Sequence, residues 1–456
     1  MNEAALAGFR ESFGGEVIAP RDPTYNTARV VWNGMVDRRP AVVARCVHVD
    51  DVISSIRFAR EQDLIVAVRG GGHSVGGFST CDGGIVIDLS GMRGVRADPE
   101  TRTARANGGA LLAELDTAAQ AFGLACPVGV VGHTGVAGLT LGGGMGRLQR
   151  RFGLTIDNLI SVDVVTAEGE LIHVSEEENG DLFWGMRGAG ANFGVVTSFE
   201  FRLHPLDPVV TQGVALYPID RAGEAATALN DVAATAPDEL MPTMNVLIAT
   251  AQPPFPSGLA GQPAIALGGT HLGSPEDAER DLKPLRALGR LADTFAPKPY
   301  LAVQGMNDEA MAWGKRFYMK GGYLAALTDE AMRVIVDRIQ DAPGSCEITL
   351  WGMGGQIART PDAAMAFTGR QATFWLGVEA FWEDPGDDDA FISWGRRTMG
   401  ALKPFTAAGH YVNDMVETDE AIVRSIYGDA KYERLLALKR AHDPDNVFRL
   451  NQNIRP

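Results

Sequence analysis

The sequence predicts an α+β protein of two domains, in which a glycine-rich first domain is completed by the C-terminal end of the chain. Glycine supports this, because 54 of the 456 residues are glycine, against a usual share of about 7%, and they gather between positions 70 and 200. Composition changes after Pro205-Leu206-Asp207-Pro208, where glycines thin out and strands alternate with long helices. That alternation favours an antiparallel sheet covered by helices on one side. The length also suits two or three domains. We place the first domain at 1–206, completed by 413–456, and the second at 207–412.

In the first domain, short strands and helices alternate. The apolar run at 64–68 is typical of a buried strand, and the apolar periodicity from 48 to 61 predicts a helix before it. Glu168-Gly169 marks the turn of a hairpin. The expected helices are 4–13, 48–61, 111–122 and 181–187. The expected strands are 41–46, 64–68, 84–89, 103–106, 160–166, 171–174 and 193–203.

The second half of the chain has a different pattern, with longer elements. Expected strands are 210–217, 243–249, 263–273, 346–353 and 373–381. Expected helices are 221–235, 275–290, 328–340 and 387–402. A further short segment at 422–427 precedes a helix over 429–442, which ends at Asp443-Pro444.

Two glycine-rich loops are the candidate ligand-binding features. The loop RGGGHSVGG (69–77) follows a predicted strand, so its backbone N–H groups are free to face an anion, with His73 beside it. If this loop is considered alone, the alternative to an anion-binding loop is a tight turn with an incidental surface histidine. The segment 123–146 is too rich in glycine for any regular element. Neither loop has the G-x-G-x-x-G spacing of the Rossmann dinucleotide motif. The run GAGANFG at 188–194 has one residue more than that motif, and it precedes a strand instead of a helix. The pattern favours a long phosphate-bearing ligand held by several separate loops.

Charge and composition narrow the class of partner. The net charge of −16 argues against nucleic acid and anionic membranes. No run of 18 apolar residues predicts a membrane span, and the N-terminus does not resemble a signal peptide. Four scattered cysteines show neither metal-ligand spacing nor a disulfide framework. We therefore expect no metal and a cytoplasmic protein.

Four ordered blocks carry a family resemblance. They are RGGGHSVGG (69–77), PVGVVGHTGVAGLTLGGGMGRLQRRFGLTIDN (127–158), DLFWGMRGAGANFGVVTSFEFRLHP (181–205) and YERLLALKRAHDPDNVFRLNQNIRP (432–456). With them the chain resembles the FAD-linked oxidases of the vanillyl-alcohol oxidase type. It is most similar to the berberine-bridge-enzyme-like branch, and there to the bacterial 6-hydroxynicotine oxidase-like flavoproteins. The blocks span roughly half the chain, and the middle domain matches only in outline.

The resemblance implies a set of FAD contacts. His73 is implied as the site of a covalent 8α-N-histidyl bond, which fixes the flavin and raises its reduction potential. Asp157 and Asn158 are implied to tie the loop structurally, and Asn451 and Asn453 to pack by the isoalloxazine ring. The other implied cofactor-binding residues are Arg69, Gly70, Gly71, Gly72, Ser74, Val75, Gly77, His133, Gly135, Gly138, Gly142, Gly143, Asn192, Gly194 and Val196.

Some family members attach the flavin a second time through a cysteine four residues before the glycine that here is Gly135. That position holds Val131. Cys126-Pro127 imitates the motif but lies five residues too early. We therefore expect a single covalent link and a packing role for Cys126.

The substrate side is less clear from the sequence. The resemblance points to Trp32 and Asn33, and to Tyr411 and Asn413 in a Tyr-x-Asn motif. The plant members' glutamate base is replaced here by Arg359. Candidate replacements are Tyr318, Lys320, Glu379, Tyr411 and Asp414, and an amine or an easily ionised phenol would need no strong base. Five aromatic residues line a flat-substrate pocket or belong to the core: Trp351, Phe374, Trp375, Phe381 and Trp382.

The expected activity is that of a flavin-dependent oxidase. The substrate would be a small aromatic or sugar-like amine or alcohol, and O2 would reoxidise the flavin to give H2O2. A dehydrogenase with another electron acceptor is the main alternative, and a non-catalytic FAD-binding protein a third. The sequence leaves the substrate and the oligomeric state open, a homodimer being one option.

Overall fold

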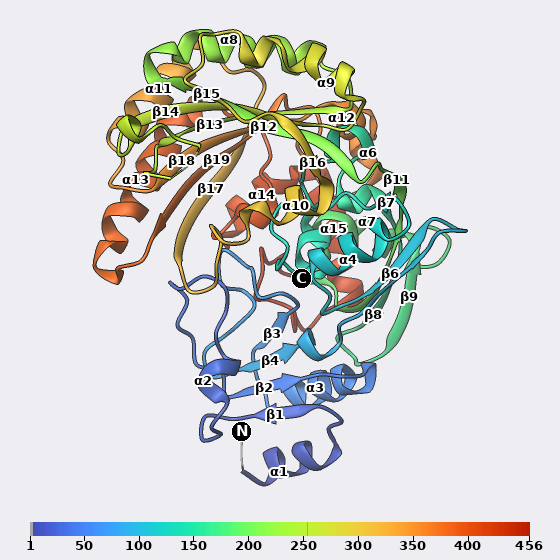
Figure 1. The fold of residues 1–456 in the computed structure, drawn as a ribbon. Helices are drawn as coiled ribbons and strands as arrows, with labels where there is room; N and C mark the ends of the chain where they lie inside the picture. Colours follow the sequence, from blue (N-terminus) through green and yellow to red (C-terminus); the bar gives the residue numbers. More distant parts are fainter. Residues whose placement is uncertain (1–2, 253) are drawn as a thin grey trace.

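A four-stranded sheet forms the N-terminal end of the molecule (Figure 1). The structure, a computed structural model, describes residues 3–252 and 254–456. This first sheet has the order β1-β2-β4-β3, with β2 and β3 both parallel to β4. Helix α3 (Val49–Glu61) connects β2 to β3 and buries its apolar side chains in the same core. The strands are β1 (Glu16–Ile18), β2 (Val42–Arg45), β3 (Val66–Arg69) and β4 (Ile85–Asp88).

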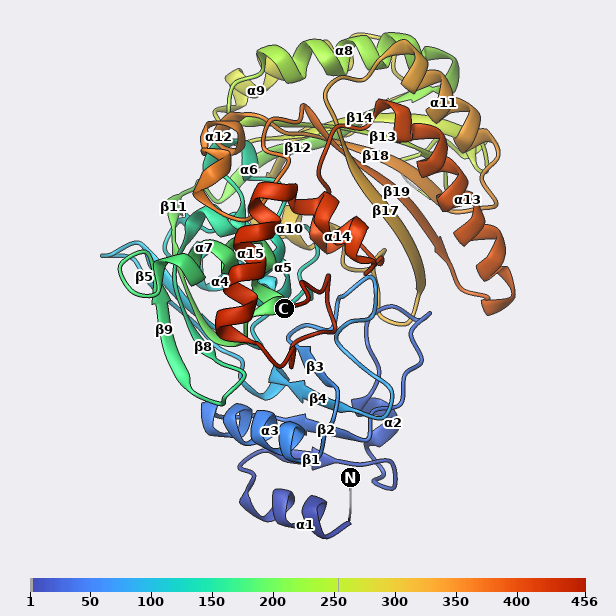
Figure 2. The same ribbon diagram turned by 180° about the vertical axis from the view of Figure 1, so that it is seen from behind.

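The middle of the molecule is a five-stranded antiparallel sheet packed against helices from residues 112–189 and from the C-terminal end of the chain (Figure 2). Its order is β5-β6-β10-β8-β9. One hydrophobic core joins this sheet to the C-terminal helices. The strands are β5 (Val95–Asp98), β6 (Thr103–Asn107), β8 (Leu159–Val165), β9 (Leu171–Ser175) and β10 (Val195–Arg202). The helices are α4 (Leu112–Gln120), α5 (Val136–Gly142), α7 (Gly180–Ala189), α14 (Glu420–Tyr427) and α15 (Asp429–His442).

A third sheet, antiparallel and eight-stranded, lies opposite the first (Figure 1). Its outer face is covered by α8 (Ala222–Thr235), α9 (Pro275–Leu282), α11 (Asp329–Gln340) and α13 (Asp388–Leu402). Short strands β15 (Ala292–Asp293) and β16 (Ala296–Pro299) pair with β12. The six long strands are β12 (Val209–Pro218), β13 (Leu240–Ile248), β14 (Pro263–His271), β17 (Arg316–Leu324), β18 (Cys346–Gly352) and β19 (Phe374–Trp382).

The predicted α+β class is confirmed, and most expected elements form. Strand β17 was not predicted, because Lys320 and two adjacent glycines interrupt its apolar pattern. The helix expected over 275–290 ends at Leu282, two residues before Pro284. Helix α10 (Tyr300–Gln304) is also additional. The domain bounds near 206 and 413 stay a prediction.

Buried ionic contacts fix the C-terminal segment in the middle core. The Lys439 ammonium is fully buried and donates to the Asp443 carboxylate at 2.7 Å and to the carbonyls of Asn192 and Phe448 at 2.8 Å. A buried charge is tolerated when its hydrogen bonds are satisfied in this way. The final residues 446–456 are thereby held beside the 190–194 turn.

A second buried acid connects α4 to α10. Asp116 on α4 accepts hydrogen bonds from Gln304 Nε2 at 3.1 Å and from the Tyr300 hydroxyl at 3.2 Å. Burial raises the pKa of Asp116 to about 7, and these two hydrogen bonds oppose the shift. The folded protein therefore holds a proton on Asp116 at pH values where the unfolded chain has lost it.

We expect Asp116→Asn to remove this pH dependence. An unfolded aspartate has a pKa of about 3.9. Wild-type stability should therefore fall as pH rises from about 4 to 7, by at most about 4 kcal/mol. In thermal melts, the Tm of the variant relative to that of the wild type should be higher at pH 8 than at pH 5. A difference in Tm that stays constant with pH would contradict a protonated Asp116.

Candidate functional site

His73 lies in a tight aromatic environment at the loop that follows β3. The Trp32 indole stacks on its imidazole at 4.7 Å between ring centroids, with 17° between the planes. His73 Nε2 lies 2.6 Å from His133 Nδ1, and Trp313 meets the ring edge-on. Burial, with a smaller contribution from His133, lowers the pKa of His73 to about 3. His73 is therefore a neutral imidazole with a nucleophilic lone pair at physiological pH.

The two glycine-rich loops touch each other through their backbones. A Cβ on Gly71 would overlap the backbone nitrogen of Gly135, and one on Gly135 would overlap that of Gly71. Gly72 has φ of +70°, a conformation that glycine adopts without strain. Gly138 on α5, in contrast, faces open space. The loops thus form one continuous backbone surface with an accessible glycine beside it.

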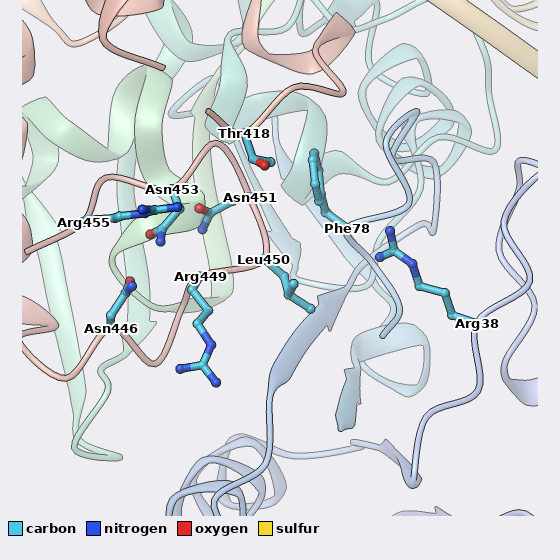
Figure 3. A pocket seen from close by; sticks show the side chains of 9 residues that line it. All are labelled: Arg38, Phe78, Thr418, Asn446, Arg449, Leu450, Asn451, Asn453 and Arg455. Atoms are coloured by element: carbon cyan, nitrogen blue, oxygen red, sulfur yellow. The ribbon is translucent and has the colours of Figure 1, made fainter. Parts of the chain in front are cut away.

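A cavity of about 450 Å³ lies between Arg38 and Phe78, the residue that follows the first loop, and the C-terminal segment (Figure 3). Arginines and asparagines dominate its lining, and no acidic side chain contributes to it. The side-chain oxygens of Asn446, Asn451 and Asn453 are buried without a hydrogen-bond partner among the described residues. The full lining is Arg38, Phe78, Thr418, Asn446, Arg449, Leu450, Asn451, Asn453 and Arg455.

Several sequence-predicted residues use their side chains within the protein. Arg69 is turned toward the N-terminal segment, where it donates to Asp88 at 3.0 Å and to the carbonyls of Ala28 and Val30. Ser74 Oγ accepts from the Phe78 backbone N–H and closes its own loop. The Arg69 side chain is therefore engaged within the protein, and its FAD contact stays a prediction.

Two of the predicted asparagines also use their side chains for hydrogen bonds within the protein. Asn33 is buried, donates to the Phe317 carbonyl at 2.9 Å and accepts from the Phe317 N–H, which clamps the N-terminal segment to β17. Asn192 donates to Gln452 O and accepts from the Ile454 N–H. Both side chains act as structural cross-links, so the structure argues against substrate contact by the Asn33 amide.

Tyr411 and Asn413 are brought to the second glycine loop. The Tyr411 hydroxyl oxygen accepts hydrogen bonds from the N–H groups of Gly144 at 3.0 Å and Met145 at 3.2 Å. Asn413 Nδ2 donates to the same oxygen and to the Leu139 carbonyl. Burial raises the pKa of Tyr411 to about 12, despite these donors. Burial therefore favours the phenol form of Tyr411, whereas the three N–H groups that converge on its oxygen would stabilise a phenolate.

The inner face of the eight-stranded sheet carries a pair of opposed carboxylates. Glu347 on β18 is directly opposite Glu379 on β19 in the strand register. Side chains at such positions lie about 5 Å apart at Cβ. Burial raises the pKa of both, and the charge of Glu347 raises that of Glu379 further. Asn245 on β13 donates to Glu347 at 3.3 Å and to Thr349.

Asp414 is a third acid at this face. Its Oδ2 accepts a hydrogen bond from Trp375 Nε1 at 2.6 Å, and it lies close against Gly321 of β17. Burial raises the pKa of Asp414 to about 7. Trp375 in turn packs on the half-buried Trp351, with 5.1 Å between ring centroids. An acid that titrates near neutrality thus sits beside an aromatic wall.

Side chains alternate along β17 and β19, so the aromatic residues predicted to line the pocket are divided between the two faces of the eight-stranded sheet. Trp375 and Phe381 belong to the layer between the sheet and the glycine loops, together with Trp32 and Tyr411. Phe374 and Trp382 belong to the helix-covered core. Two of the five aromatic residues predicted for the pocket are therefore ordinary core.

Tyr318 and Lys320 also lie on the helix-covered side, which argues against their predicted catalytic role. Tyr318 packs in the helix-covered core and accepts from Arg396 of α13. Lys320 forms an ion pair with Glu417. Their neighbour Met319 faces the glycine loops instead. The sequence pattern could not show this, because β17 was not recognised as a strand.

Glu347 and Asn245 are polar groups that the sequence analysis did not select. The run Cys346-Glu347-Ile348-Thr349-Leu350-Trp351 alternates apolar residues with polar or amphipathic ones, which indicates a strand with a core face and a second, functional face. That alternation is the pattern that could have identified Glu347.

Membrane-spanning helices and metal-ligating clusters are absent from residues 3–252 and 254–456. No helix there is long and apolar enough to cross a membrane, and no group of metal-ligating side chains is gathered. Cys126 is fully buried, and burial raises the pKa of its thiol well above the usual range. A thiol in that state is inert, which agrees with a packing role.

Comparison with known proteins relates the chain to flavoproteins over its whole length. Residues 40–175 match the family described as FAD binding domain, and residues 410–455 the family described as berberine and berberine like. The (R)-6-hydroxynicotine oxidase of Paenarthrobacter nicotinovorans is 33% identical over 98% of this chain and 97% of its own length. An FAD-linked oxidoreductase of Dictyostelium discoideum is 31% identical over 93% of this chain and 91% of its own.

Solved structures agree with these matches. The crystal structure of 6-hydroxy-D-nicotine oxidase from Arthrobacter nicotinovorans superposes with a TM-score of 0.86 at 31% identity, covering 98% of both chains. A chitooligosaccharide oxidase shares the fold at 23% identity, with a TM-score of 0.86 and 99% coverage of both chains. The protein is thus an FAD-dependent oxidoreductase and belongs to the berberine-bridge-enzyme-like family of FAD-linked oxidoreductases.

Proposed function

We propose that this chain is an amine oxidase, in which FAD held by His73 accepts a hydride from a C–H bond next to nitrogen and passes the electrons to O2. The observation that carries the proposal is the placement of two features across one apolar layer. The neutral His73 imidazole lies at the end of the glycine loops, and the acids Glu347, Glu379 and Asp414 lie on the sheet face opposite. The similarity to (R)-6-hydroxynicotine oxidase supports an amine rather than a sugar.

The residues around the glycine loops fit FAD. The 450 Å³ cavity offers arginines to a diphosphate, in a protein whose net charge is −16. Its three unpartnered asparagine oxygens suit the N–H and O–H groups of a nucleotide. Gly138 leaves space for close backbone approach. Gly70, Gly71, Gly72, Gly135, Gly142 and Gly143 would supply the backbone surface along the cofactor.

His73 is the proposed covalent anchor. Trp32 stacking and the His133 contact fix the imidazole in one orientation, which is what a directed nucleophile needs. Cys126 offers no second link, since its thiol is buried and protonated.

The aromatic layer would hold a flat substrate under the sheet. Trp351 and Trp375 provide the wall, and Asp414, which its pKa of about 7 leaves partly ionised near neutrality, attracts a protonated amine. Asp414 takes the ammonium proton, because its pKa of about 7 lets it exchange protons near neutrality. The amine nitrogen then has its lone pair free to stabilise the developing cation.

We expect the purified protein to be yellow and to form H2O2 with amines. Small aromatic secondary or tertiary amines should bleach the flavin without oxygen, and one H2O2 should appear per turnover in air. Sugars should bleach it at least about 100-fold more slowly, if the acids select a cation. Rapid bleaching combined with slow reoxidation by O2 would indicate a dehydrogenase instead.

We expect His73→Ala to abolish covalent flavin while leaving bound FAD. The measurement is flavin fluorescence of the denatured chain on a gel, together with flavin in the supernatant after acid precipitation. Cys126→Ala serves as the matched control and should keep the covalent flavin. Equal covalent flavin in His73→Ala and wild type would overturn the tether.

We expect Asp414→Asn to lower kcat/KM about 100-fold or more, because the general base is lost. In the wild type, kcat/KM should rise as pH increases through about 7, where Asp414 loses its proton. The variant should lack this limb of the pH profile. Tyr318→Phe, on the helix-covered face, should behave as the wild type. An unchanged pH profile in Asp414→Asn would exclude Asp414 as the base.

A further inference from the structure

His73 and His133 are the first two members of a short hydrogen-bonded chain that ends on the 305–308 segment. His73 Nε2 lies 2.6 Å from His133 Nδ1, and His133 Nε2 lies 3.3 Å from the backbone carbonyl oxygen of Asp308. The three groups come from three different parts of the sequence. His73 and His133 belong to the two glycine-rich loops, whereas Asp308 follows the turn Gly305–Asn307.

The Asp308 carbonyl at the end of this hydrogen-bonded series determines which ring nitrogen of each histidine carries the hydrogen. A carbonyl oxygen only accepts, so His133 Nε2 carries a hydrogen and donates it. Neutral His133 then has its lone pair on Nδ1, which must accept from His73. His73 therefore carries its hydrogen on Nε2 and its lone pair on Nδ1.

We propose that His133, oriented by the Asp308 carbonyl, is the positioning residue that makes Nδ1 of His73 the nucleophile for attachment of the flavin. This inference rests on the proposed tether at His73. It adds the attacking atom, the group that receives the proton, and the requirement that the 305–308 segment be in place. Burial supports it, because the low pKa of His73 keeps the imidazole neutral.

The attachment reaction balances with this arrangement. One C–H bond of the flavin 8α-methyl group is broken and a C8α–Nδ1 bond is formed. Bond formation makes the His73 ring cationic, so its Nε2 proton passes to His133 Nδ1. The electron pair of the broken C–H bond would reduce the flavin ring, and the proton of that bond and the proton taken up by His133 would pass to solvent. O2 would then accept the two electrons with two protons to give H2O2.

Asp308 also fixes the loop that carries His133. Its Oδ1 accepts from the Gly132 N–H at 2.6 Å, one residue before the histidine. A Cβ on Gly132 would approach Asp308 Oδ2 at 2.7 Å, so this contact is close-packed. The segment that supplies the carbonyl is therefore the same one that sets the distance to His133. Attachment should be slow until this segment has docked.

The experiment follows attachment rather than catalysis. Full-length chain produced under riboflavin limitation is incubated with FAD, and covalent flavin is measured over time from gel fluorescence and intact mass. We expect His133→Ala to slow attachment about 100-fold or more, with non-covalent FAD affinity nearly unchanged. His133→Asn offers an amide oxygen close to the Nδ1 position and should restore attachment at least in part.

Asp308 provides a matched pair of variants. Asp308→Asn keeps an acceptor for the Gly132 N–H and should attach flavin like the wild type. Asp308→Ala loses it and should be slower by about 10-fold. The aminoacyl-flavin released by proteolysis should be linked at Nδ1.

The outcomes separate the two proposals. Wild type without covalent flavin would refute the tether itself. Covalent wild type with unimpaired attachment in His133→Ala, or with the link at Nε2, would overturn the role of His133 and leave the tether standing. Circular dichroism and FAD titration of each variant distinguish slow attachment from misfolding.

Discussion

The close approach of two glycine loops is the constraint on which the site depends. Gly71 and Gly135 meet backbone to backbone, at a separation that no side chain could share. This contact brings the loop after β3 and the loop before α5 together, and so places His73 against His133. Hydrogen-bonded imidazoles in a desolvated setting keep a fixed orientation. The chemistry proposed for His73 follows from that packing.

The C-terminal segment lines the proposed cofactor cavity because it is held from inside the core. Lys439 satisfies all its hydrogen bonds with Asp443 and two carbonyls, one of them from the 190–192 turn. The chain beyond it then passes along the cavity, where Asn451 and Asn453 present free amide oxygens. Residues at opposite ends of the sequence thus meet at one ligand surface. A buried ion pair with satisfied partners here serves specificity of arrangement as much as stability.

The eight-stranded sheet forms the wall of the site opposite the glycine loops. One face of the sheet packs under the helices, and the other faces the site. Residues that alternate along β18 either pack under the helices, as Ile348 does, or face the glycine loops, as Glu347 does. Burial raises the pKa of Glu347, and burial together with the neighbouring acids raises that of Glu379, so the pair favours protonated carboxyl groups over two like charges in register. Asp414, with a pKa of about 7, is the acid at this face that carries a charge near neutrality. The proposed amine substrate therefore depends on Asp414 more than on the glutamate pair.

The sequence by itself determined the fold class and the family, and it located the two glycine-rich loops, because glycine clusters and local motifs are readable without long-range contacts. It also marked His73, Tyr411 and Asn413, each within a short motif. Only the tertiary structure decided which side chains are free to act. It committed Arg69 and Asn33 to internal hydrogen bonds, turned Tyr318 toward α13, and brought Glu347 opposite Glu379. The physical reason is that strand register and loop docking depend on partners hundreds of residues away, so the direction of a side chain is not encoded in its local pattern.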